Sequence, residues 1–208
     1  EFKTPLTSIK MFSEMLLQND RSLSEKSKNH LEIIEGESDR LTRLINNVLD
    51  FSKIEKGVKD YSFREIHFNK IVKNVMELMQ YTIKMKGFTL ETNLKDFNDL
   101  ICGDADAITQ AVENIVSNAI RFSAEKKEII VSTFFNQGFA CVSVKDYGIG
   151  LDQFDINKIF DPFFTTKEKG VGLGLSIAHK IVNQHKGSLS VANDSGKTVF
   201  SLHLPKNT

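Results

Sequence analysis

The chain has 208 residues, 40% of them hydrophobic and 26% charged, which is ordinary for a globular protein and enough for two modest domains. Lys plus Arg equal Asp plus Glu at 27 each, so the zero net charge excludes long-range attraction to nucleic acid or to an anionic membrane surface. No apolar run approaches the roughly 18 residues that a membrane-spanning helix needs.

The start of the chain and its cysteines indicate where it resides. The sequence begins without Met inside a patterned segment, so we expect a fragment of a longer protein, in which any membrane anchor lies upstream. Cys102 and Cys141 lack metal-ligand spacing and favour idle thiols in a reducing cytosol. We therefore expect a cytoplasmic fragment.

Residues 1–57 predict a helical hairpin. The first helix spans about residues 1–19, and Ser22 with Glu25 fits a capping box for the second, which runs to about residue 55 before Gly57. Because one apolar stripe on each of two helices buries little surface, we expect a dimeric four-helix bundle; packing on the rest of the same chain is the alternative. The heptad seam that favours the dimer consists of Leu31, Ile34, Ser38, Leu41, Ile45, Val48 and Ser52.

Beyond a short linker, residues 62–208 predict a second domain of mixed helices and strands. Helices are expected at 69–85, 106–122 and 171–186, and Asp104 is expected to cap the second of them. Strands are expected at 62–68, 88–94, 128–135, 139–145, 187–193 and 198–204, with Asn136-Gln137-Gly138 as a hairpin turn between the third and the fourth of them. The whole chain is therefore expected to be α+β, with a mixed or antiparallel sheet covered by helices on one face, an α/β sandwich.

One group of polar residues shares a helix face. Asn114, Asn118 and Arg121 are spaced by four and three, so they lie on one side of the expected helix. Amide oxygens are hard ligands suited to Mg²⁺, and Arg binds phosphate oxygens, so this face suits a magnesium–triphosphate complex. An ordinary solvated helix face is the alternative.

Two glycine-containing motifs follow. Asp146, Gly148 and Gly150 form Asp-x-Gly-x-Gly at a strand end, where a carboxylate can accept a hydrogen bond from an amine such as that of adenine; a simple turn is the alternative. Residues 170–175, Gly-Val-Gly-Leu-Gly-Leu, open a helix and predict an anion site. The segment 151–170 between them is expected to be a mobile lid, or alternatively a hydrophobic plug.

In order and spacing these motifs, with Phe-Asp-Pro-Phe-Phe at 160–164, resemble the N, G1, F and G2 boxes of histidine kinases. The resemblance implies a Bergerat-type ATP-binding domain, shared with gyrase-type topoisomerases, mismatch-repair ATPases and heat-shock chaperones. It implies that Asn118, supported by Asn114, coordinates Mg²⁺ and that Asp146 binds the adenine amine. The other nucleotide-binding residues that it implies are Arg121 and Phe122, Gly148 and Gly150, Lys167, Gly170, Gly172, Leu173 and Gly174.

Residues 1–6, Glu-Phe-Lys-Thr-Pro-Leu, resemble the phosphoacceptor box of the same family, in which a His directly precedes this string. The resemblance implies that this His takes the γ-phosphoryl group of Mg-ATP, with Glu1 as base or orienting carboxylate, and passes it to an Asp of a response regulator receiver domain. Glu1 and Thr4 also resemble the signature for dephosphorylating that partner. A phosphatase-only or pseudokinase regulator is one alternative, and a non-kinase Bergerat ATPase or a structural dimerisation module is another.

Overall fold

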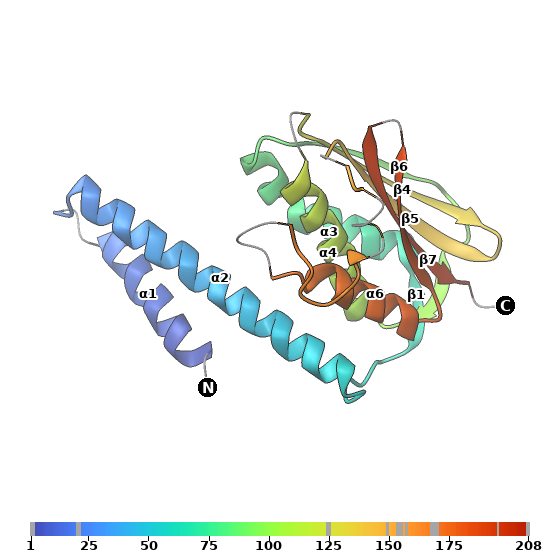
Figure 1. Ribbon diagram of the computed structural model, residues 1–208, viewed down its shortest axis with the longest axis horizontal. Coiled ribbons are helices and arrows are strands. Elements are labelled where there is room, and N and C mark those ends of the chain that lie inside the picture. The colour runs from blue at the N-terminus through green and yellow to red at the C-terminus, as the bar shows by residue number, and fades with distance from the viewer. Residues whose placement is uncertain are drawn as a thin grey trace. The chain divides into compact units, whose positions relative to one another are not determined.

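The computed structural model describes residues 3–19, 22–123, 126–148, 150–152, 156, 158–166, 171–194 and 196–206. The chain divides into two compact units, residues 1–58 and 59–208 (Figure 1). None of the helices within the described ranges is long and apolar enough to cross a bilayer.

The first unit is a hairpin of α1 (Lys3–Asn19) and α2 (Glu25–Glu55). Ser24 caps α2 by accepting a hydrogen bond from the Ser27 backbone N–H at 3.1 Å, so the expected capping box of Ser22 and Glu25 is wrong. Glu25 is already the first helical residue, which leaves Ser24 as the residue in extended conformation that can cap. At the other end Gly57 adopts φ +64°, and the Val58 N–H bonds the Lys53 carbonyl, as in a Schellman motif.

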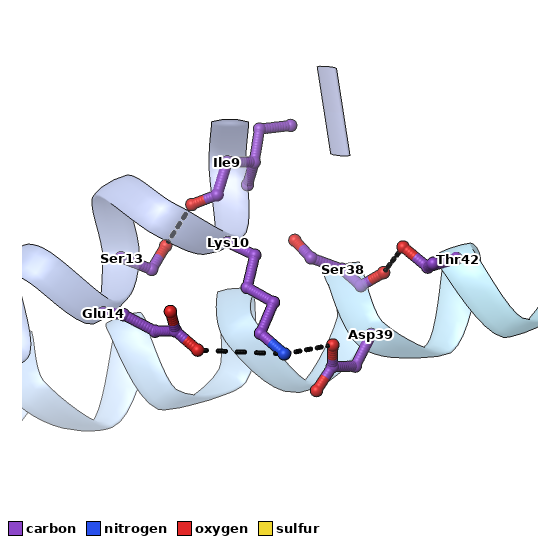
Figure 2. Close-up of polar contacts among 7 residues, drawn as sticks. All are labelled: Ile9, Lys10, Ser13, Glu14, Ser38, Asp39 and Thr42. Atoms are coloured by element: carbon purple, nitrogen blue, oxygen red, sulfur yellow. Dashed lines mark hydrogen bonds and ion pairs between the residues drawn. The ribbon is translucent and has the colours of Figure 1, made fainter. Parts of the chain in front are cut away.

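An ion pair between Lys10 of α1 and Asp39 of α2 connects the two helices of the hairpin, as Figure 2 shows. The Lys10 ammonium donates to Asp39 at 2.8 Å and lies 3.7 Å from Glu14, and the hydrogen bond to Asp39 raises the pKa of Lys10. Ser13 and Ser38 are the buried polar residues of the hairpin, and the Ser13 hydroxyl donates to the carbonyl of its own preceding turn. Lys10 and Asp39 thus pair across the two helices, while Ser13 and Ser38 are buried in the hairpin.

The apolar residues of the hairpin remain exposed. Of the expected heptad seam only Ser38 is buried. Ten large apolar side chains on α1 and α2 are 43–58% exposed: Ile9, Met11, Phe12, Met15, Leu16, Ile33, Ile34, Leu41, Val48 and Leu49. The folded hairpin therefore presents an uncovered apolar surface, larger than scattered exposed residues would give.

The second unit is built on a five-stranded mixed sheet in the order β2-β4-β5-β7-β6. The strands are β2 (Thr89–Leu94), β4 (Glu128–Asn136), β5 (Phe139–Asp146), β6 (Ser188–Asp194) and β7 (Lys197–Pro205). β2 runs parallel to β4, and the remaining neighbours are antiparallel. β1 (Arg64–His67) and β3 (Leu100–Gly103) form a separate two-stranded sheet.

Three helices cover one face of the large sheet (Figure 1): α3 (Phe68–Met85), α4 (Ala105–Phe122) and α6 (Gly174–Gln184). Side chains alternate between buried and less buried along β4, β5 and β7, and the buried set packs under the helices. The interior side of α4 is fully buried, with Val112, Ile115 and Val116 each at most 1% exposed. The expected α+β class, with helices on one face of a mixed sheet, is confirmed.

Local chemistry explains several element ends. Gln137 and Gly138 join β4 to β5 with φ values of +47° and +89°, as a tight two-residue hairpin turn requires, and confirm the expected hairpin. Asp104 caps α4, as expected, by accepting from the Ala107 N–H at 2.9 Å. α6 begins at Gly174 rather than at residue 171, because Gly172 has φ +69° and cannot continue a right-handed helix.

Candidate nucleotide-binding site

Asn114 and Asn118 both lie half-buried on α4, the helix whose opposite side forms the core. A Cβ atom added to Gly174, the first residue of α6, would lie 3.5 Å from Asn114 Oδ1, so the start of α6 contacts this face of α4. Asn114 Nδ2 is buried and has no hydrogen-bond partner within the described ranges. A buried amide without a partner is costly, so Asn114 Nδ2 is a candidate contact for a ligand bound at the junction of the two helices.

The first turn of α6 presents backbone N–H groups at the same junction. Leu173 occupies its N-cap position, and its side chain cannot accept a hydrogen bond from the helix. The first backbone N–H groups of a helix have no partner inside the helix, and together with the helix dipole they favour an anion. Phosphate oxygens placed beside Asn114 and Gly174 would therefore meet both amide and backbone donors.

Asp146, the last residue of β5, is 2% exposed. The Gly148 N–H donates to its Oδ1 at 2.8 Å, and within the described ranges no hydrogen bond reaches Oδ2. Burial raises the pKa of Asp146 from 3.8 to about 6, because desolvation penalises the charged carboxylate more than the Gly148 bond favours it. Above pH 6 the site therefore holds a buried carboxylate with one unused oxygen, which suits the amine of a purine base.

Glycine is required at position 148 by close contacts. A Cβ there would approach Asp146 Oδ1 to 2.6 Å and the Phe122 carbonyl oxygen to 2.9 Å. Ser123 and Gly148 also form an antiparallel bridge, which joins the end of α4 to the loop after β5. The Asp146 motif, about thirty residues from Asn114 and Asn118 in the sequence, therefore lies against the C-terminal end of α4, the helix that carries both asparagines.

The same loop is fixed on its other side by a residue that no sequence motif indicated. Asn193 of β6 donates from Nδ2 to the Leu151 carbonyl at 2.6 Å, and its Oδ1 accepts from the Leu151 N–H at 3.4 Å. Gly150, immediately before Leu151, has φ +76°, which favours glycine.

The described part of the phenylalanine-rich segment packs against the glycine motif and α6. Phe160 stacks on His179 of α6, with ring centroids 4.9 Å apart and planes inclined by 20°. The Phe163 N–H donates to the Gly172 carbonyl at 3.0 Å, and any side chain at Gly172 would collide with the Phe164 carbonyl. Phe163 itself is 60% exposed, so the segment is partly anchored and partly open.

The structure thus brings Asn114 next to Gly174, and Phe122 and Asp146 next to Gly148. Arg121 is exposed on the last turn of α4, and Thr4 is exposed on α1 in the first unit. Glu1, Lys167 and Gly170 lie outside the described residues, so their roles stay predictions.

The candidate magnesium ligands on α4 are the amide oxygens of Asn114 and Asn118. In the described part of the chain no group of three or more His, Cys, Asp and Glu residues is placed to hold a metal ion. Asn114 and Asn118 supply amide oxygens on one face of α4, and Mg²⁺ commonly completes its octahedral shell with water and substrate phosphates. The residues present fit a magnesium ion that arrives with a phosphate ligand.

The architecture, a helical hairpin followed by a helix-covered mixed sheet, is that of a histidine kinase core. Residues 103–208 match the histidine kinase-, DNA gyrase B- and HSP90-like ATPase family, and residues 1–57 match the His Kinase A (phospho-acceptor) domain. The chain therefore belongs to this ATPase family and is homologous to sensor histidine kinases.

Individual relatives agree with this assignment. Sensor histidine kinase WalK of Bacillus subtilis is 32% identical over 99% of this chain and 35% of its own length, and sporulation kinase C of the same organism is 30% identical over 99% and 46%. The chain spans less than half the length of these relatives.

Solved structures show the same fold. Full-length ShkA in complex with AMPPNP has a TM-score of 0.82 and 25% identity over all of this chain and 44% of its own. Histidine kinase ThkA in complex with the response regulator TrrA has a TM-score of 0.72 and 26% identity over 99% of this chain and 59% of its own.

Proposed function

We propose that this chain is the catalytic core of a two-component sensor histidine kinase, which transfers the γ-phosphoryl group of Mg-ATP to a histidine and then to a response regulator. The observation that carries the proposal is the arrangement along α4. The middle of that helix carries a buried Asn114 amide, without a partner in the described ranges, against the start of α6, and its C-terminal end is joined through Ser123 to Gly148 in the loop after Asp146. An adenine nucleotide lying along α4 would contact both places.

In this proposal Asp146 accepts a hydrogen bond from the adenine amine on its free oxygen, and Gly148 and Gly150 shape the wall beside the base. Asn118 and Asn114 orient the metal-bound phosphates, with Arg121, Lys167 and the backbone of residues 170–174 around them. Bound magnesium would neutralise phosphate charge. Phosphoryl transfer needs little covalent help from the protein, so positioning and charge neutralisation account for most of the catalysis.

The acceptor in this proposal is a histidine directly before Glu1, close in sequence to the start of α1 at Lys3. Glu1 would orient its imidazole or take its proton. Thr4, one helical turn further along, would position water for dephosphorylating the regulator, which gives the core a phosphatase activity as well. The sequence Glu-x-x-Thr at residues 1–4 and the exposure of Thr4 on α1 support this role.

Two partners follow. We infer a homodimer through residues 1–57, because ten large apolar side chains of the hairpin are exposed and a second copy would bury them in a four-helix bundle. We infer a response regulator receiver domain as the phosphoryl acceptor, supported by the solved complex of ThkA with TrrA. The core would work in the cytoplasm, and any membrane attachment would come from an upstream segment.

The test is incubation of a protein extended upstream of Glu1 with γ-labelled ATP and Mg²⁺. The proposal expects label that is labile in acid and stable in base, as phosphohistidine is, and that is lost in Asn118→Asp. Binding of Mg-ADP without any phosphohistidine label would contradict the kinase activity and favour the alternative, a nucleotide-binding phosphatase or pseudokinase. Absence of both binding and label would contradict the proposal.

A further inference from the structure

Asn193 contacts the base side of the proposed site from a distant part of the sheet. Asp146 on β5 pairs with Thr198 on β7, and Thr198 pairs with Asn193 on β6, so these three residues lie in one row across the sheet. Residues directly opposite one another in paired strands project to the same face. Asn193 and Asp146 therefore both project to the helix-covered face, on either side of Thr198.

From this position the Asn193 amide bonds the loop after Asp146 through both of its polar atoms. It donates to the Leu151 carbonyl at 2.6 Å and accepts from the Leu151 N–H at 3.4 Å. The single Asn193 side chain thus makes the paired donor and acceptor hydrogen bonds that a neighbouring strand's backbone would make with Leu151. Asn is suited to it because its short side chain carries both an acceptor and a donor.

The loop is thus held at both ends. Its first end is fixed by the Gly148 N–H bond to Asp146 and by the bridge between Gly148 and Ser123. Its second end, at Gly150 and Leu151, is held by the hydrogen bonds from Asn193 to Leu151. Gly150 has φ +76° and carries no side chain that could add a further contact to this end of the loop. Removing the Asn193 bonds would release only the second end.

We propose that Asn193 is a positioning residue for the nucleotide base, which acts by holding Gly150 and Leu151, the far end of the loop that follows Asp146, against β6. The inference rests on the nucleotide site proposed above and assigns one more residue to it. Asn193 is itself exposed and outside the core, so its substitution should leave the fold intact. Its effect should be concentrated at the base end, because both of its hydrogen bonds are made to Leu151 in the loop after Asp146.

The experiment measures Mg-ADP affinity by calorimetry in the whole chain for wild type, Asn193→Ala and Asn193→Asp. Two hydrogen bonds of ordinary net strength predict affinity weaker by about tenfold in Asn193→Ala. Asn193→Asp should bind no better than Asn193→Ala, because it places a carboxylate oxygen against the Leu151 carbonyl. Asp194→Ala is the matched control: it removes the neighbouring hydrogen bond to Lys145 and should leave the affinity unchanged.

Kinetics separate positioning from a general structural effect. In an upstream-extended protein, Asn193→Ala should raise the KM for ATP about tenfold and leave kcat within about twofold, since binding of the base changes and phosphoryl transfer does not. Unchanged Mg-ADP affinity in Asn193→Ala, or an equal loss in Asp194→Ala, would overturn the role of Asn193. A wild-type chain that binds no Mg-ADP would overturn the nucleotide site itself.

Discussion

Replacing Asp146 by Asn should stabilise the second unit while removing its affinity for adenine nucleotides. Asp146 is 2% exposed, and burial raises its pKa from 3.8 to about 6. Asn keeps an oxygen that can accept from the Gly148 N–H, and it brings no charge into the interior. It cannot, however, offer a carboxylate oxygen to the base amine.

The size of the stabilisation follows from the pKa. In the folded chain the carboxyl keeps its proton up to about pH 6, whereas in the unfolded chain it loses the proton near pH 3.8. Between these values the folded state binds more protons, so stability falls as pH rises, and the full penalty is present above pH 6. An interval of about two pH units at 1.36 kcal/mol per unit makes this penalty about 3 kcal/mol at pH 7.5, and it vanishes toward pH 4.

Tyrosine fluorescence can follow this unit alone. The chain has no Trp, and its three tyrosines, Tyr61, Tyr81 and Tyr147, all lie within residues 59–208. A gain of about 3 kcal/mol predicts a melting temperature higher by about 6–12 °C at pH 7.5. The matched control is Asp96→Asn, which removes the same charge from an exposed position and should change stability by less than about 0.5 kcal/mol.

The reasoning would be refuted if Asp146→Asn melted lower than wild type at both pH 7.5 and pH 5. That result would mean that the charged carboxylate supports the fold. Retained Mg-ADP affinity in the variant would separately contradict the assignment of Asp146 to the base.

Three further predictions concern other parts of the chain. Gly172→Ala should destabilise the second unit by at least about 1 kcal/mol and weaken Mg-ADP binding, because φ is +69° and the new Cβ meets the Phe164 carbonyl; calorimetry should show a smaller effect for Gly196→Ala, where nothing lies within 4 Å. Burial lowers the pKa of His185, whose Nε2 accepts from the Asp104 N–H. As pH falls below about 6.5 the unfolded chain therefore takes up this proton first, and wild type should lose stability that His185→Gln does not lose; equal slopes of unfolding free energy against pH would contradict this. Gly36→Ala should stabilise α2 by about 1 kcal/mol, because Ala favours a helix over Gly and no atom lies within 4 Å of the added Cβ. Thermal unfolding of the chain, followed by the helical circular dichroism signal, should show the gain, and an unchanged transition would count against it.

Features that depend on neighbours in the sequence could be predicted without the structure. The spacing of Asn114 and Asn118 placed them on one helix face, Asp104 was identified as a cap, and Asn136-Gln137-Gly138 marked a hairpin. Other local predictions failed: Ser24 caps α2 in place of Ser22, and α6 begins at Gly174 rather than at residue 171. β3 was missed, because its four residues gave no alternating pattern long enough to detect.

Other features depend on which distant segments meet, and only the tertiary structure decided them. The raised pKa of Asp146 results from burial beneath helices far along the chain, and the unpartnered Asn114 amide results from the approach of α6. Asn193 reaches Leu151 because β7 lies between β5 and β6, a strand order that no local pattern encodes. Helix and strand periodicity are properties of adjacent residues, whereas desolvation and hydrogen bonds between loops arise from long-range packing. The sequence by itself therefore determined the motifs and the helices and strands that carry most of them, and the tertiary structure decided how their chemistry is tuned and held in place.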